Sequence, residues 1–167
     1  VRNKVRACRE LGIHSEEHLF PESATCETVL RRIEALNANP TIHGILVQLP
    51  LPPQIEVQRV LQHIATEKDV DGFSLYNVGG LVSGGTVFPP CTPYGVTCLL
   101  EYSGISIAGQ NVVVVGASTV VGKPMALMLL QKEATVAVCH IKTRDLAQFT
   151  ILADILIVAA GKPNLIT

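Results

Sequence analysis

The feature that most constrains the fold is a run of four valines at 112–115 that ends directly in a loop bounded by Gly116 and Gly122. A short continuous apolar run is typical of a strand buried on both faces of a parallel sheet. After the loop, apolar residues recur at helical spacing, and further apolar runs follow at 135–139 and 154–158. This order of strand, loop, helix, strand, helix and strand predicts a Rossmann-like α/β domain.

The loop between the valine strand and the helix is our candidate nucleotide site, formed by Gly116, Ala117, Ser118 and Gly122. Backbone N–H groups and the helix dipole can hold a phosphate at such a place. The spacing is not G-x-G-x-x-G, because Ser118 takes the second glycine position, and it is not a Walker A loop, because Pro124 follows the lysine. A glycine turn that merely joins strand to helix is the alternative.

The segment after the second predicted strand bears on the choice of cofactor. NAD-binding folds usually place an acidic residue there, about twenty residues beyond the loop, to bind the ribose hydroxyls. This chain has His-Ile-Lys-Thr-Arg at 140–144, with no carboxylate before Asp145. Lys142 and Arg144 favour a 2'-phosphate, which predicts NADP, with NAD as a possible substitute; a solvated loop without a ligand is the alternative.

The first part of the chain reads as helices around one apolar run. Helical periodicity is present at 1–11, 25–36 and 57–64, and the run G-I-L-V-Q-L at 44–49 predicts a buried parallel strand. Gln48 would lie at its carboxyl end, where open α/β sheets bind ligands. A Gly/Ser-rich stretch at 78–86 leads to the boundary, so we expect an N-terminal α/β domain at 1–91 and a Rossmann-like domain at 92–167. The first opens within a helix and the second has three strands, so we expect both to be incomplete.

Composition and charge exclude several classes of function. A net charge of −1, with no Lys/Arg run longer than two, predicts no binding to nucleic acid or to a membrane surface. The longest apolar runs are far shorter than the roughly 20 residues of a membrane helix. Five cysteines without C-x-x-C spacing indicate reduced thiols. We expect neither a metal site nor a cysteine nucleophile, because no histidine has a partner at a convincing metal-ligand spacing.

Five fragments, in one order along the chain, together resemble a family of folate enzymes. They are N-K-V-R-A at 3–7, G-I-L-V-Q-L-P-L-P at 44–52, K-D-V-D-G at 68–72, P-C-T-P at 90–93, and G-A-S followed by V-G-x-P at 116–124. The chain is similar in these fragments to the bifunctional methylenetetrahydrofolate dehydrogenase/methenyltetrahydrofolate cyclohydrolase family. The resemblance implies a folate-holding lobe, a Rossmann lobe with substrate bound in the cleft between them, and a homodimer.

The resemblance also implies which residues line the site. The family's Tyr-x-x-x-Lys motif, the glutamine of V-Q-L-P and the second aspartate of K-D-V-D-G correspond to Lys4, Gln48 and Asp71. The motif's tyrosine would precede Val1, and the family's P-G-G-V-G-P segment would follow Thr167. Val47 and Leu49, which flank Gln48, complete the expected folate contacts.

The implied cofactor contacts are Gly116, Ala117, Ser118, Gly122 and Ile141. Members of the family that favour NADP often carry Arg or Ser where this chain has Ala117 and Ile141. The chain departs from the NADP pattern at these two positions.

The implied activity is oxidation of 5,10-methylenetetrahydrofolate to the methenyl form with NADP, followed by hydrolysis to 10-formyltetrahydrofolate. Gln48 would orient the amine of Lys4, Lys4 would transfer protons in the hydrolysis, and Asp71 would anchor the pterin ring. Two alternatives remain: a catalytically inactive folate- or nucleotide-binding subunit, and a dehydrogenase without cyclohydrolase activity. We expect a reducing compartment, the cytoplasm or the mitochondrial matrix.

Overall fold

The computed structural model describes residues 1–166 and divides into two compact units, Val1–Lys68 and the residues from Asp69 onward. This division lies inside the segment expected to form the N-terminal domain. The domain boundary after Cys91 therefore stays a prediction. Within residues 1–166, no helix is both long enough and apolar enough to cross a membrane.

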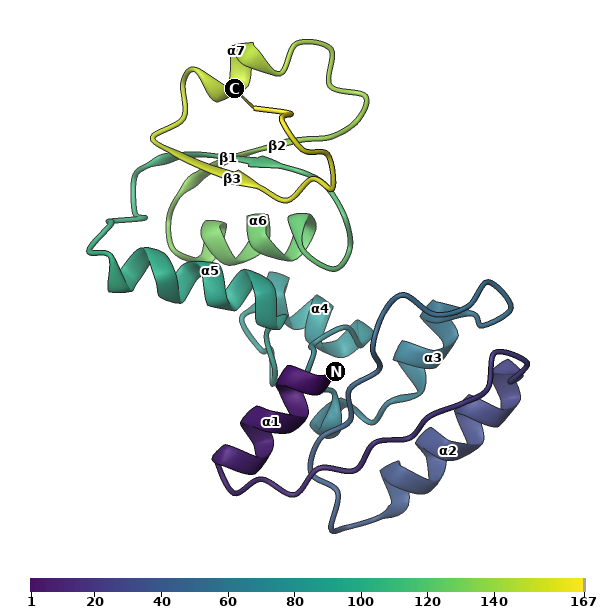
Figure 1. Cartoon of the computed structure of the whole chain (residues 1–167). Coiled ribbons are helices and arrows are strands. Elements are labelled where there is room, and N and C mark those ends of the chain that lie inside the picture. Colours follow the sequence, from purple (N-terminus) through teal and green to yellow (C-terminus); the bar gives the residue numbers. More distant parts are fainter. Residues whose placement is uncertain (167) are drawn as a thin grey trace. The chain divides into compact units, whose positions relative to one another are not determined.

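The first unit is built from helices, at the places where helical periodicity predicts them (Figure 1). Its elements are α1 (Arg2–Glu10), α2 (Cys26–Ala38), α3 (Val57–His63) and a short 3-10 helix, η1 (Thr66–Lys68). Helix α2 begins after Thr25, whose Oγ1 accepts a hydrogen bond from the backbone N–H of Thr28 at 3.3 Å. Helices α2 and α3 contact each other through the core of this unit. The buried side chains of the two helices are Cys26, Val29, Leu30, Ile33, Val60 and Leu61.

The strand expected at 44–49 is not formed, which corrects the sequence prediction. Only Ile45 makes a bridge: it is buried, and its N–H donates to the carbonyl of Lys68 at 2.7 Å. Leu46 is 39% exposed, so the run is not buried on both faces. A strand needs a neighbour to pair with, and among the described residues up to Lys68 no β-ladder runs alongside this segment. Gln48 therefore lies in an extended loop.

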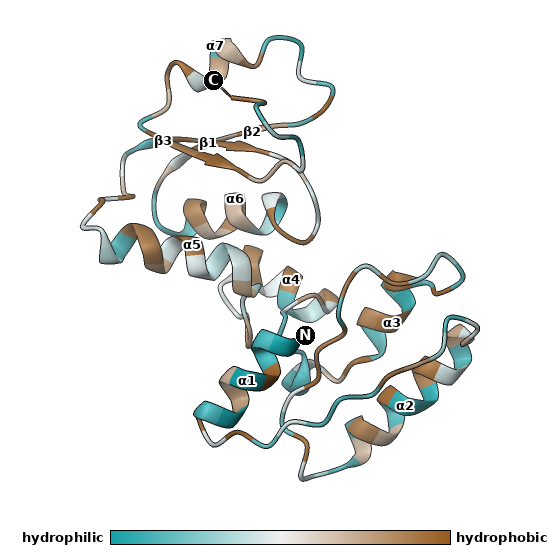
Figure 2. Cartoon of the chain, in the orientation of Figure 1, coloured by the Kyte–Doolittle hydropathy of each residue, from teal (hydrophilic) through white to brown (hydrophobic). Residues whose placement is uncertain are grey.

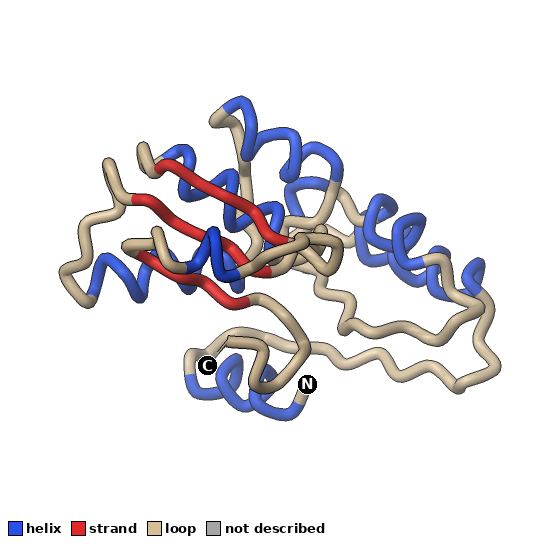
Figure 3. The backbone as a smooth tube through the Cα atoms, turned by 90° about the horizontal axis from the view of Figure 1, so that it is seen from above, coloured by secondary structure: helices blue, strands red, loops and turns tan. Residues whose placement is uncertain are grey.

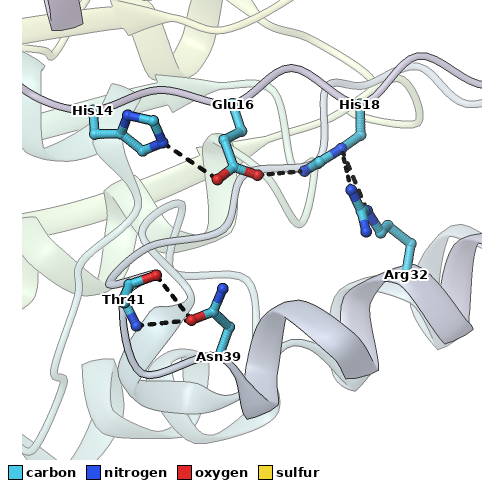
Figure 4. Close-up of polar contacts among 6 residues, drawn as sticks. All are labelled: His14, Glu16, His18, Arg32, Asn39 and Thr41. Carbon is cyan, nitrogen blue, oxygen red and sulfur yellow. Dashed lines mark hydrogen bonds and ion pairs between the residues drawn. The ribbon is translucent and has the colours of Figure 1, made fainter.

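The stretch between α1 and α2 is fixed by a polar network rather than by sheet pairing. Figure 4 shows Glu16 between two imidazoles, with its oxygens 3.3 Å from His14 Nε2 and 3.4 Å from His18 Nε2. Arg32 of α2 lies 2.9 Å from His18 Nδ1 through Nη2. Because a guanidinium only donates, His18 Nδ1 must accept, and its proton lies on the Nε2 that faces Glu16. The network links this extended stretch to α2.

The second unit contains a parallel three-stranded sheet with the order β2-β1-β3. Its strands, β1 (Asn111–Val115), β2 (Thr135–Cys139) and β3 (Ile155–Val158), lie where the apolar runs predict them and run side by side in Figure 3. Residues of β1 alternate between the two faces, so Val112 and Val114 enter one core and Val113 and Val115 the other. The mixed α/β architecture with a Rossmann-like half is confirmed.

Helices lie on both faces of this sheet. Figure 2 shows that the strands are mainly hydrophobic. Helix α6 (Gly122–Gln131) contacts β1 and β2 on one face and is itself contacted by α4 (Leu75–Ser83) and α5 (Cys91–Tyr102). The short α7 (Ala147–Thr150) lies on the opposite side of the sheet in Figure 1. Met125 and Leu129 of α6 are fully buried against the sheet.

Helix α4 occupies most of the Gly/Ser-rich stretch at 78–86. It begins after Ser74, whose side chain accepts from the N–H of Asn77, and ends at Gly84, which has a left-handed φ of 83°. A serine before and a glycine after a helix are the usual boundary residues. The glycines within this stretch argue against a helix, whereas Ser74 and Gly84 are residues typical of helix ends and predict one.

Candidate functional site

Lys4 and Gln48 lie together in the first unit, 44 positions apart in the sequence. Lys4 Nζ donates to Gln48 Oε1 at 3.4 Å, the long end of the hydrogen-bond range, and both residues are exposed. Gln48 Nε2 donates to the carbonyl of Leu49 at 2.9 Å, which fixes the orientation of the amide. The amide oxygen is thus left to face the lysine.

The local backbone explains how these two side chains are presented. Lys4 precedes Cys8 by four residues on α1, so it shares the helix face on which Cys8 is half-buried. Val47 and Leu49 are half-buried on either side of Gln48, which turns Gln48 outward. The following Leu49–Pro50 peptide is cis. The predicted folate residues of this unit therefore form one local group on α1 and the 47–49 loop.

Asp71, the third predicted catalytic residue, belongs to the second unit. It is partly buried in a turn that is closed by the Gly72 N–H donating to the carbonyl of Asp69 at 3.1 Å. Gly72 has a φ of +71°, and a Cβ on it would overlap the carbonyl oxygen of Phe88. Only glycine fits this close approach, so the glycine of K-D-V-D-G is required by the turn.

The first two residues of K-D-V-D-G have structural partners that the sequence analysis missed. Lys68 Nζ donates to the carbonyls of Leu36, Asn37 and Asn39 at 3.0, 2.7 and 2.8 Å and so caps the carboxyl end of α2. Asp69 is buried, and its Oδ2 accepts bonds from within the second unit. A lysine and an aspartate in a turn carry no sequence signal for such distant partners.

The nucleotide loop joins β1 to α6 at the carboxyl edge of the sheet. Gly116 has a φ of +125°, and a Cβ on it would overlap the carbonyl oxygen of Ala159 at the end of β3. A Cβ on Gly122 would overlap the carbonyl oxygen of Gly116 across the loop. Both glycines are therefore required by close backbone approach, as in a loop that brings its main chain up to a phosphate.

Ser118 organises the start of α6. Its Oγ accepts from the N–H groups of Val121 at 3.1 Å and Gly122 at 3.4 Å, and its carbonyl accepts from the N–H of Lys123 at 2.9 Å. A serine hydroxyl has two acceptor positions and one proton. With both acceptor positions occupied, the proton remains available to donate to an anion, which suits a phosphate oxygen.

The corner after β2 is a closed turn with cationic side chains. His140 N–H donates to Thr143 Oγ1 at 2.9 Å, and Thr143 N–H donates to the carbonyl of His140 at 2.8 Å. Ile141 is 97% exposed at the tip, and Lys142 and Arg144 lie beside it. Because β1 and β2 are parallel neighbours, this corner and the nucleotide loop follow the same edge of the sheet.

The cysteines of the chain are free thiols in different environments. Burial raises the pKa of the Cys139 thiol above its usual value. A hydrogen bond with Cys98 is the main cause that raises the pKa of the Tyr94 hydroxyl.

Within residues 1–166, no group of three or more His, Cys, Asp or Glu side chains is arranged to hold a metal ion.

An apolar hollow of about 570 Å³ lies next to the turn that carries Asp71. Val70, the neighbour of Asp71, contributes to its wall, together with residues of the 88–89 segment and of α5. Cys91 Sγ donates to the carbonyl of Val70 at 3.3 Å and ties the start of α5 to this turn. The P-C-T-P fragment thus adjoins K-D-V-D-G within the second unit.

Comparison with known proteins identifies close relatives. The chain is 63% identical over 167 residues to a bifunctional protein FolD from Nitrosospira multiformis and 57% identical over 167 residues to one from Moorella thermoacetica. All of this chain is covered, but only 58% and 60% of those relatives. The chain thus spans less than two thirds of the curated relatives it matches.

Solved structures of the same kind match the fold. A bifunctional FolD enzyme from Campylobacter jejuni has 49% sequence identity and a TM-score of 0.97, over 99% of this chain and 59% of that one. A methylenetetrahydrofolate dehydrogenase-cyclohydrolase from Trypanosoma brucei, complexed with NADP cofactor and an inhibitor, has 37% identity and a TM-score of 0.94, over 99% of this chain and 57% of that one.

Two domain models of one family also match, in the order that the sequence resemblance implies. Residues 1–71 match the catalytic domain and residues 90–167 the NAD(P)-binding domain of tetrahydrofolate dehydrogenase/cyclohydrolase. The first match contains Lys4, Gln48 and Asp71, and the second contains the nucleotide loop. The chain belongs to the tetrahydrofolate dehydrogenase/cyclohydrolase family.

Proposed function

We propose that the protein carrying this chain oxidises 5,10-methylenetetrahydrofolate to 5,10-methenyltetrahydrofolate with NADP and hydrolyses the product to 10-formyltetrahydrofolate. The observation that carries this proposal is the contact of Lys4 Nζ with Gln48 Oε1 at 3.4 Å, in a segment that matches the catalytic domain of the family. NADP would take up the hydride from the folate. The residues of this chain would hold both molecules and move the protons.

Lys4 and Gln48 have the chemistry that the two steps require. Loss of hydride leaves a cationic methenyl group, next to which a hydrogen-bonded amide is better tolerated than a rigidly fixed charge. Gln48, held by the carbonyl of Leu49, directs its oxygen to Lys4 and orients the amine. Lys4 is then our candidate for proton transfer when water adds to the methenyl carbon. Val47 and Leu49 would contact the folate beside Gln48.

Asp71 is proposed to anchor the pterin ring. A carboxylate accepts hydrogen bonds from the ring N–H and amino groups, which positions the substrate without taking part in proton chemistry. The contact of Lys4 with Gln48 supports the proposal for these two residues, whereas the role of Asp71 rests on the family resemblance.

NADP is proposed to bind at the carboxyl edge of the sheet. Gly116, Ala117, Ser118 and Gly122 would approach its phosphates, with the Ser118 hydroxyl as a donor. Lys142 and Arg144 would attract the 2'-phosphate, and Ile141 would lie against the cofactor through its exposed side chain. The structure of the Trypanosoma brucei relative with NADP supports this choice.

Initial rates of methenyltetrahydrofolate formation test the proposal, with NADP and NAD compared at equal concentrations. The whole protein that carries this chain is used. Turnover that prefers NADP is the expected result, and turnover that prefers NAD would refute the cofactor assignment only. Binding of folate and nucleotide without turnover would establish the inactive-subunit alternative. Oxidation without hydrolysis of added methenyltetrahydrofolate would establish a dehydrogenase without cyclohydrolase activity.

We also propose a homodimer in a reducing compartment. The five free thiols support a reducing environment, and the bacterial relatives support the cytoplasm over the mitochondrial matrix. The homodimer rests on the family resemblance. Sedimentation equilibrium of the whole protein tests it, and a monomer at micromolar concentration would refute it.

A further inference from the structure

Asp69, the first aspartate of K-D-V-D-G, is more deeply buried than Asp71, the aspartate proposed to bind the substrate. Asp69 is 1% exposed, and its Oδ2 accepts from the Ser74 N–H at 2.7 Å and from Asn77 Nδ2 at 3.0 Å. A buried carboxylate is costly unless hydrogen bonds satisfy it. The two donors hold Asp69 against the first turn of α4.

Asn77 extends this contact to a second segment of the chain. It is fully buried, and its Oδ1 accepts from the N–H groups of Val87 and Phe88, both at 3.1 Å. Its backbone carbonyl accepts from Thr86 Oγ1 at 3.0 Å. Asn77 therefore connects Asp69 to the 86–88 loop, with which it forms three hydrogen bonds.

The 86–88 loop in turn forms the surface against which the turn of Asp71 lies. Gly72 fits so closely there that a Cβ would overlap the Phe88 carbonyl oxygen and come within 2.8 Å of Pro90 N. The Gly72 N–H closes the turn on the carbonyl of Asp69. Asp71 is thus held on one side by Asp69 and on the other by Gly72 against a loop that Asn77 fixes.

We propose that Asp69 and Asn77 are positioning residues that hold the carboxylate of Asp71 where the folate binds. The inference rests on the proposed function, because it assigns a role in substrate binding by that site. The hydrogen bonds of Asp69 and Asn77 are all internal, so they act on the folate only through Asp71. A displacement of Asp71 weakens its bonds to the pterin ring without altering the nucleotide loop.

The substitution Asp69→Asn tests this role because it keeps the size of the side chain and replaces one acceptor oxygen by a donor nitrogen. The amide oxygen can take the place of Oδ2 and meet both donors, but it is uncharged and accepts more weakly than a carboxylate oxygen, so the hold on the first turn of α4 loosens. We expect the KM for 5,10-methylenetetrahydrofolate to rise about tenfold, with kcat and the KM for NADP within about twofold of the wild type.

Asp154→Asn is the matched control. Asp154 Oδ2 also accepts from one backbone N–H and one asparagine Nδ2, those of Asn111, at 2.8 and 3.2 Å. It precedes β3, at the edge of the sheet opposite the nucleotide loop. This variant should leave both KM values unchanged. An equal rise of the folate KM in the two variants would show a general loss of structure and overturn the proposal.

A double-mutant cycle separates positioning from a merely structural role. If Asp69 acts through Asp71, Asp69→Asn should add little to the folate KM once Asp71→Asn is present. Additive effects would overturn the inference. Thr86→Val, which removes only the bond to the Asn77 carbonyl, provides a milder probe if Asp69→Asn does not fold; it should raise the folate KM in the same direction, and an unchanged value would count against the proposal.

The wild type separates failure of the inference from failure of the proposed function. A wild-type protein that never turns over methylenetetrahydrofolate with either cofactor refutes the function. A wild type and an Asp154→Asn variant that are both active, beside an Asp69→Asn variant with an unchanged folate KM, refute the positioning role alone.

Discussion

Replacing Gly122 by alanine should displace the nucleotide loop. The added Cβ would overlap the carbonyl oxygen of Gly116 and stand 3.0 Å from the Cα of Ala117, both of them backbone atoms. No flexible side chain can move away, so the loop itself must shift. Overpacking of this kind costs about 1–3 kcal/mol, and the better helix propensity of alanine returns at most about 1 kcal/mol.

The net loss, of up to about 3 kcal/mol, lowers the Tm by about 4–8 °C for each kcal/mol in a unit of this size. Gly79→Ala is the matched control, because Gly79 is an exposed helical glycine with nothing within 4 Å of the position that its new methyl group would take. That change should stabilise the protein by about 0.5–1 kcal/mol.

Two measurements on the same samples decide the matter: thermal unfolding, and the Kd for NADP from isothermal titration calorimetry. Gly122→Ala should lower the Tm and weaken NADP binding about tenfold or more, since the shifted loop can no longer bring its backbone to the phosphate. Equal Tm and Kd values in Gly122→Ala and the wild type would refute the role of close approach in this loop.

Three further predictions concern single side chains. Lys4→Met should slow hydrolysis of methenyltetrahydrofolate by about 10²–10⁴-fold. The control Arg6→Met removes only an exposed ion pair with Glu10 on the same helix and should leave the rate unchanged. The assay is the loss of methenyl absorbance, and a full rate in Lys4→Met would refute the proton-transfer role. Lys68→Met should destabilise the protein by about 1–3 kcal/mol in urea unfolding, because three carbonyls at the end of α2 lose their donor. The control Lys132→Met removes an exposed ion pair with Glu101 and should cost at most about 1 kcal/mol. Equal losses in the two variants would contradict the capping of α2 by Lys68. Burial raises the pKa of the Cys139 thiol above that of the unfolded thiol. The contribution of this thiol to stability is therefore complete below about pH 8.5 and is lost as the pH rises through the folded pKa. Cys139→Ala should flatten this alkaline fall in the free energy of unfolding, and a pH profile identical to that of the wild type would contradict the prediction.

The sheet of the second unit could be predicted from sequence because its signals are local. Each strand is a short apolar run between turns, and a parallel strand covered on both faces needs nothing else to be recognised. The predicted run at 135–139 matches β2, and the valines at 112–115 fall within β1. The glycine-bounded loop followed from the same local reading, because its two glycines stand where strand and helix must meet.

The run at 44–49 shows where local reading fails. Its composition is that of a buried strand, yet strand formation depends on a partner that the run itself does not encode. In the described part of the first unit the segment is extended, with Ile45 buried and Leu46 exposed. Gln48 loses the support of the expected strand end but stays a predicted site residue, because the family resemblance also points to it and its side chain contacts Lys4.

The K-D-V-D-G fragment makes the same point about the site. Its second aspartate can be proposed from the resemblance alone, but the work of its other residues depends on partners far along the chain. Lys68 bonds carbonyls of α2 in the first unit, and Asp69, the next residue, bonds α4 in the second. Consecutive residues are therefore anchored on opposite sides of the division between the units. A motif of this kind holds Asp71 at a fixed place relative to its own unit, and for that reason its structural residues bear on substrate binding as much as the residue that we propose to contact the substrate.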